Sequence, residues 1–234
     1  MAAPTFVSYG ASAFNSTTTP KTVSVTTQTG DRLLVIAYVE SGSLPTTTAP
    51  TGNSNTFTQI DNYPSSNDNT VGRHIAWSCT EASGTTYNVS CSRPSSDTAV
   101  WWGCEVWIYR DSDGFGAVAT ATSAGTASVT ITTTQANSAV CMGGVDWNAV
   151  DGASRTAQTV NSSTGTEGTY FRDSTRYTVY TRRWDDVGSA ASKTVGYSAP
   201  SGQKFAGVAV EIKGTSAVAP PQIVIPSRPW QYNF

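Results

Sequence analysis

The feature that most constrains this chain is a faint internal echo of its own sequence. Segments 22–27 and 30–40 resemble 128–133 and 136–146, at the same separation in both cases (128 − 22 = 136 − 30 = 106). Further on, 102–110 resembles 205–213 at a slightly smaller separation (205 − 102 = 103), after a three-residue deletion. Because a repeated sequence implies a repeated architecture, we predict two pseudo-repeated halves, at about 22–111 and 128–214.

Both halves have the pattern of β-strands. Val, Ile, Thr, Tyr and Trp alternate with polar residues between clusters of Gly, Pro, Asn and Ser, which is typical of strands, and no window has helical periodicity. The sequence therefore predicts an all-β fold for 1–214: an antiparallel β-sandwich or jelly-roll-like domain, with a short connector at 111–127. Thirteen strands are expected: 4–9, 21–27, 32–40, 56–61, 72–80, 87–92, 98–110, 126–133, 138–147, 155–160, 176–183, 193–198 and 203–213.

Two of these segments, 98–110 and 203–213, are apolar at successive positions and not only at alternate ones. A strand with one face in water shows a cleaner alternation. We therefore expect both strands to lie inside a sheet, with another layer covering their second face.

The last residues, 215–234, differ from everything before them. A linker with two prolines, 215–221, is followed by hydrophobic side chains at Ile223, Val224, Ile225, Trp230, Tyr232 and Phe234. Leaving such side chains in water costs about 1.5–3 kcal/mol each. Two interpretations stay open: the tail folds back on its own domain, or it is an arm that adds a strand to the sheet edge of a neighbouring subunit.

The composition excludes several classes of function. Only 13% of the residues are charged and the formal net charge is −2, whereas nucleic-acid binding needs clustered Lys and Arg. No apolar run approaches the length of a membrane span, so we expect neither a nucleic-acid nor a membrane partner. The first residues lack the basic and apolar regions of a signal peptide, which suggests synthesis in the cytoplasm or a leader already removed.

The four cysteines, at positions 79, 91, 104 and 141, form no C-x-x-C pair, so a zinc site is not expected. Cys79 and Cys91 flank the predicted turn 82–84. A disulfide across that turn and two buried free thiols are both open.

Residues for catalysis are few. The single histidine, His74, lies in a predicted strand without a nucleophile motif around it. The carboxylates Glu40, Glu105 and Glu211 lack the spacing of a glycosidase pair. Asp111 to Gly114 resembles the start of a calcium loop without its downstream glutamate. The sequence predicts no enzyme, no catalytic residue, no cofactor and no metal.

Aromatic side chains near predicted loops suggest one binding function. Trp184 is flanked by two arginines and two aspartates, and Tyr170 and Tyr63 fall near other strand ends. Exposed rings beside hydrogen-bonding groups suit the stacking of sugars, although loop aromatics also pin loops to a core. A carbohydrate-binding module of a secreted or surface protein is therefore the alternative function.

The segments 4–10 and 21–40, together with the aromatic strand that ends at 107–110, resemble the all-β minor tail or head-decoration proteins of tailed double-stranded DNA phages. The resemblance implies an oligomeric β-sandwich subunit that stabilises or adorns a particle, or meets the host surface, and it brings no catalytic residue. The expected function is a non-enzymatic virion component, made in the host cytoplasm and extracellular in the mature particle. Its expected partners are other virion subunits, further copies of itself and a host-surface glycan.

Overall fold

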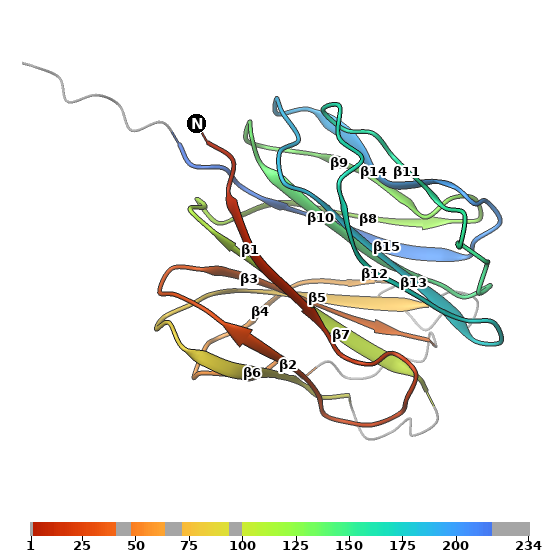
Figure 1. Cartoon of the computed structure of the whole chain (residues 1–234), viewed down its shortest axis with the longest axis horizontal. Coiled ribbons are helices and arrows are strands. Elements are labelled where there is room, and N and C mark those ends of the chain that lie inside the picture. Colours follow the sequence, from red (N-terminus) through yellow and green to blue (C-terminus); the bar gives the residue numbers. More distant parts are fainter. Residues whose placement is uncertain (1, 41–47, 64–71, 94–99, 217–234) are drawn as a thin grey trace, which may run out of the picture.

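The computed structural model describes residues 2–40, 48–63, 72–93 and 100–216. Within these residues the fold is all-β, without a helix, and strands that pair within a sheet are antiparallel (Figure 1). The described residues accordingly contain no helix that could cross a membrane. The expected all-β, sandwich-like fold is thus confirmed, whereas the jelly-roll description stays a prediction.

The first half forms one large and one small sheet. Sheet 1 has the order β1 (Thr5–Ala11), β7 (Trp102–Arg110), β3 (Arg32–Val39), β5 (Arg73–Thr80), β4 (Thr58–Tyr63). The small sheet pairs β2 (Lys21–Thr26) with β6 (Thr86–Cys91).

The second half has a corresponding arrangement. Sheet 2 has the order β8 (Phe115–Ser123), β15 (Phe205–Ile212), β10 (Ala139–Asp146), β13 (Tyr177–Trp184), β12 (Thr166–Asp173). Its small sheet contains β9 (Ser128–Thr132), β14 (Ser192–Ala199) and β11 (Thr156–Ala157). Strand for strand, the order of sheet 2 matches that of sheet 1.

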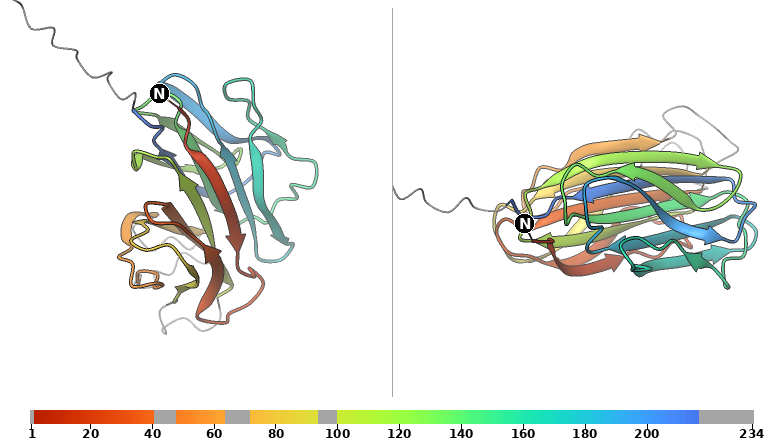
Figure 2. Two further views of the ribbon diagram at one scale, coloured as in Figure 1. Left: turned by 60° about the vertical axis from the view of Figure 1, so that its left-hand side comes forward. Right: turned by 90° about the horizontal axis from the view of Figure 1, so that it is seen from above.

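The sheets lie in layers (Figure 2), and among the described residues three buried apolar clusters hold these layers together. Outer core 1, between the β2-β6 sheet and sheet 1, includes Val23, Leu33, Val89 and Val106. The central core, between sheets 1 and 2, includes Leu34, Trp107, Val179 and Val208. Outer core 2, between sheet 2 and its small sheet, includes Val129, Val140, Trp184 and Phe205. The molecule is therefore a stack of four β-layers.

The stack explains the strands that are apolar at successive positions. β7 and β15 lie inside their sheets, and every residue of β15 and all but the last of β7 are buried. Successive side chains of a strand point to opposite faces, so each of these strands supplies an outer core and the central core at once. The expected central position of both strands is confirmed.

The constant separation read from the sequence holds for some strands and is wrong for others. It pairs Val23 with Val129, and both face an outer core. It also pairs Leu33 with Ala139, yet Leu33 lies in outer core 1 and Ala139 in the central core. A one-residue slip exchanges the two faces of a strand, so the separation between β3 and β10 is larger by one and pairs Leu33 with Val140. The repeat of the sequence itself stays a prediction.

All thirteen expected strands have counterparts among the fifteen strands of the described residues. The other two, β8 and β12, were not expected, and the connector at 111–127 was wrong because it contains β8. In β8 the residues that pack against outer core 2 are alanines, at 117, 119 and 121. Their small apolar surface gave too weak an alternation to identify a strand.

Candidate functional site

The single histidine is part of sheet 1. His74 is buried on β5, and its Nε2 lies 2.5 Å from Oδ2 of Asp61 on the neighbouring strand β4. The imidazole thus links two neighbouring strands of sheet 1, as expected for a structural histidine.

Glu105 is one of the three carboxylates that were considered as catalytic acids of a glycosidase. Its side chain points into the central core and is fully buried. One carboxylate oxygen accepts hydrogen bonds from the Tyr38 hydroxyl (2.5 Å) and the Trp107 indole (2.9 Å). The other accepts one from the Tyr9 hydroxyl (2.9 Å). Burial raises the pKa of Glu105 to about 7, although the three donors favour the ionised form.

Two glycines of the second half make room for this network. A Cβ at Gly143 would overlap the Tyr38 hydroxyl, and a Cβ at Gly168 would overlap the ring of Trp107. The Glu105 network therefore depends on a close approach of sheet 2.

The other two carboxylates hold segments together. The Glu211 carboxylate is buried and accepts hydrogen bonds from groups of Ala117, Thr134, Gln135 and Ser138, at 2.8–3.0 Å. Glu40 accepts hydrogen bonds from the backbone N–H of Trp101 (2.9 Å) and from Arg176 of the second half (3.0 and 3.1 Å). Each of the three carboxylates thus accepts hydrogen bonds from groups of the fold itself.

The aromatic residues expected to bind glycans do not form an exposed platform. Trp184 is the last residue of β13 and is fully buried in outer core 2, so its expected exposed loop position was wrong. The charged residues around it suggested a loop, but strand alternation turns the indole away from the side of Arg183.

Tyr170 packs against the same outer core 2, whereas Tyr63 belongs to sheet 1. Tyr170 is half-buried on β12, and the Arg155 guanidinium lies 4.0 Å from its ring centroid and covers one face. Tyr63 ends β4 and pairs with His74 in the ladder. Tyr170 and Trp184 thus meet at outer core 2, where the indole of Trp184 is fully buried and offers no exposed platform. Of the predicted linker and arm at 215–234, residues 217–234 lie outside the described residues.

The four cysteines are buried free thiols. A Cys79–Cys91 disulfide is therefore absent, and the strands on either side of the turn 82–84 do not pair, because β5 belongs to sheet 1 and β6 to the small sheet. Cys91 instead interacts with Cys104, and this hydrogen bond, together with burial, raises the pKa of the Cys91 thiol.

The segment that resembles a calcium loop anchors the end of the described chain. Oδ2 of Asp113 accepts hydrogen bonds from the backbone N–H and the hydroxyl of Ser216, at 2.7 and 2.6 Å. Across the described ranges, no group of three or more His, Cys, Asp or Glu side chains is placed to hold a metal.

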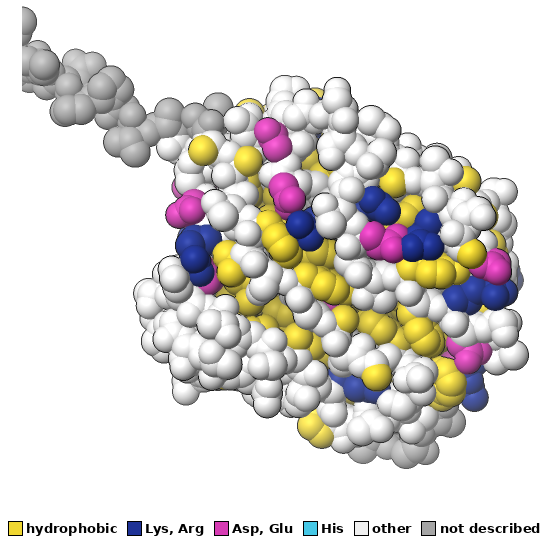
Figure 3. All heavy atoms as spheres, viewed as in Figure 1, with side chains coloured by type: hydrophobic (Ala, Val, Ile, Leu, Met, Phe, Trp, Pro, Cys, Tyr) yellow, Lys and Arg dark blue, Asp and Glu magenta, His cyan; other side chains and the backbone are white. Residues whose placement is uncertain are grey.

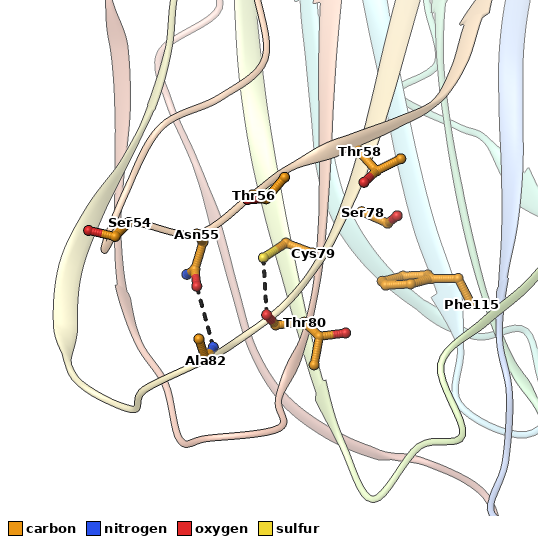
Figure 4. Close-up of a pocket in the computed structure, with 9 residues that line it drawn as sticks. All are labelled: Ser54, Asn55, Thr56, Thr58, Ser78, Cys79, Thr80, Ala82 and Phe115. Carbon is orange, nitrogen blue, oxygen red and sulfur yellow. Dashed lines mark hydrogen bonds between the residues drawn. The ribbon is translucent and has the colours of Figure 1, made fainter.

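Two open grooves are lined by described residues alone. Groove A, of about 440 Å³, lies where the β4–β5 margin of sheet 1 meets β8 of sheet 2 (Figure 4). Phe115 enters it from β8, and the opposite side carries mainly small polar side chains. Its lining consists of Ser54, Asn55, Thr56, Thr58, Ser78, Cys79, Thr80, Ala82 and Phe115.

Groove B, of about 450 Å³, lies between β1 and β2. It is lined by residues 7–10 of β1, by 24–28 on and after β2, and by Arg110. The Arg110 guanidinium donates to both oxygens of the buried Asp31 carboxylate, at 2.7 and 2.8 Å. Among the described strands β1 pairs only with β7 and β2 only with β6, so groove B runs between two strand edges.

No protein-family model, no curated protein and no solved structure matches the chain. Its function is therefore inferred from the residues of the fold and of the two grooves.

The sequence predicted neither groove. Phe115 lies in the unexpected strand β8, and the other residues of groove A are mostly serines and threonines that are also frequent on the rest of the surface. At the separation of 106 read from the sequence, Phe6 falls opposite Ser112 and not opposite Phe115, so the comparison of the two halves gave no signal for this groove.

Proposed function

We propose that this protein is a non-enzymatic structural component of a phage virion, a capsid decoration or minor tail protein, that acts by binding other subunits. The resemblance of 4–10, 21–40 and 107–110 to such proteins supports the class. The surface is in keeping with it: the face in Figure 3 carries few charged side chains, in small groups, and a band of hydrophobic side chains.

One observation carries the proposed binding mode. Ala2, three residues before β1, bridges to Thr215, next to the last described residue, Ser216. Ser216, to which 217–234 is attached, therefore lies close to the start of β1, the strand that borders groove B. Strand edges carry unpaired N–H and C=O groups that can pair with an added strand.

The occupant that we propose for groove B is the segment 222–226 of a second copy. At about 3.3 Å per residue, the segment 217–234 would span roughly 60 Å when fully extended, which is enough to cross to a neighbour. Ile223, Val224 and Ile225 are three successive β-branched residues, a residue type that is enriched in strands. Main-chain hydrogen bonds would supply affinity and alternate side chains would supply specificity.

The buried acids support a role without catalysis. Glu105, Glu211 and Asp31 each accept two or more hydrogen bonds from the fold. These contacts use the carboxylates to position strands and turns.

Locating the protein on particles tests the proposal. Particles purified from the source would be analysed by proteomics and by electron microscopy with labelled antibody against residues 2–216. We expect a regular label on the head or the tail. A protein that is abundant in the lysate and absent from every particle would contradict the virion proposal.

A further inference from the structure

The two margins of the central core have equivalent frameworks. Paired residues form the row Phe6–Tyr109–Arg32–Thr80 across sheet 1. Across sheet 2 the corresponding row is Phe115–Ile212–Ala139. The last pair between β10 and β13 is Val140 with Trp184, so the next residue, Asp185, stands opposite Ala139 and completes the row. Phe6 and Phe115 also stand next to the same one-residue bulge in β1 and β8. Phe115 is therefore the counterpart of Phe6, and Thr80 of Asp185.

At the first margin, the aromatic ring is covered. Arg183 precedes Asp185 by two residues. Its guanidinium carbon lies 3.4 Å from the ring centroid of Phe6. Arg183 also donates to Asp185, at 2.9 Å. A cation over a ring and an ion pair thus fill this margin.

At the second margin, the counterparts of Arg183 and Asp185 are Ser78 and Thr80. Their short side chains leave Phe115 half-buried, with its ring in groove A and opposite Ser78 (Figure 4). Groove A is thus the space that an arginine and an aspartate occupy on the equivalent margin.

The lining of groove A is aromatic and neutral polar. Five Ser or Thr hydroxyls can both donate and accept hydrogen bonds, whereas the Asn55 amide already donates to Glu81 and Tyr87 and accepts from the backbone N–H of Ala82. None of the lining side chains carries a charge. The nearest charged groups have protein partners: Arg32 donates to Thr80 and to the carbonyl of Ser112 (3.1 Å), and Glu81 accepts from Asn55 and Tyr87 at 3.0 and 2.7 Å.

We propose that groove A binds a neutral carbohydrate. A sugar ring has an apolar C–H face, which fits the open ring of Phe115, and peripheral hydroxyls, which fit the Ser and Thr side chains. A pocket with one aromatic surface and a few convergent polar groups is typical of small-ligand sites. An ionic ligand would find no counter-charge among these side chains. This site does not depend on groove B, so it can hold whether or not the proposed assembly does.

The test uses an array of neutral and anionic microbial glycans, followed by affinity electrophoresis of the full chain in gels with dextran, mannan, galactan or alginate. Two variants block the site differently. Phe115→Ala removes the ring, and the double variant Ser78→Arg, Thr80→Asp copies the Arg183–Asp185 pair into groove A. Val118→Thr is the control, because Val118 is exposed on the same strand (37%) and outside groove A.

We expect the wild type and Val118→Thr to bind at least one neutral glycan with equal affinity, and both groove variants to bind it at least tenfold more weakly. If Phe115→Ala does not fold, the double variant decides, since it keeps the ring. No binding to any neutral glycan, binding to anionic glycans only, or unchanged binding by a folded double variant would overturn the proposal.

Discussion

At the scale of single residues, Glu105 shows how a polar group serves an apolar core. A buried carboxyl without partners is strongly unfavourable. Here three donors from β1, β3 and β7 converge on it, and two glycines of sheet 2 leave the space. The three hydrogen bonds offset the effect of burial only in part, so the pKa of Glu105 is still raised to about 7.

This pKa predicts a dependence of stability on pH. Because the folded-state pKa of Glu105 (about 7) exceeds its ordinary value of 4.5, the folded state holds the proton more tightly. The unfolding free energy should therefore fall as pH rises from about 4.5 to 7, by about 3 kcal/mol in total. Glu105→Gln should lack this component, and urea unfolding at pH 5 and pH 8 measures it.

Asp111→Asn is the control for Glu105→Gln. Asp111 is exposed and has a φ of 53°, a backbone conformation that asparagine tolerates. The control should keep the pH dependence of the wild type. An equal pH dependence in Glu105→Gln and the wild type would contradict the assigned role of Glu105.

At the scale of elements, the sequence was informative where strands are long and apolar and uninformative where small residues suffice. β7 and β15 were predicted with their buried second face, because large side chains fill both faces. β8 was missed, since alanines face its core. The one-residue slip between β3 and β10 was also missed, because both strands are apolar on their two faces and either alignment keeps the pattern.

The candidate binding site was likewise only partly predictable from the sequence. The sequence identified aromatic residues as ligand candidates but could not tell Trp184, which packs into outer core 2, from Phe115, which lies in groove A. That distinction depends on how the two sheets face each other, and short-range pattern carries no information about it.

Glu211 tests how one side chain joins several elements. It connects β15 to β8 and to the turn between β9 and β10 through five donor groups. Glu211→Gln would leave some of these buried donors without an acceptor, so we expect a loss of about 2–4 kcal/mol at pH 7. Ser138→Ala, which removes one donor, should cost only about 1 kcal/mol in the same denaturation experiment.

The pH dependence of this effect has the opposite sign to that of Glu105. Burial favours the neutral form of Glu211, but hydrogen bonds led by the backbone N–H groups of Ala117 and Thr134 outweigh it and lower its pKa below 4.5. Its stabilisation is therefore present above about pH 4.5 and is lost as pH falls through the lower folded-state pKa. A stability difference between wild type and Glu211→Gln that grows in acid would contradict this assignment.

At the scale of the whole molecule, four β-layers place two unlike grooves on one scaffold. Groove A lies on a margin of the central core, and groove B lies between the edges of β1 and β2. The two proposals therefore concern separate places on the scaffold: a subunit at groove B and a glycan at groove A.

The most direct test of the proposed subunit binding is the mass of the protein in solution, measured by light scattering across a concentration series. The full chain should be an oligomer, whereas a chain that ends at Ser216 and the variant Ser24→Lys should be monomers. Ser24 lines groove B, and Thr22→Lys is the matched control, exposed on the same face of β2 but outside the groove; it should assemble like the wild type. A monomeric full chain, or an oligomer that survives both the truncation and Ser24→Lys, would contradict the account.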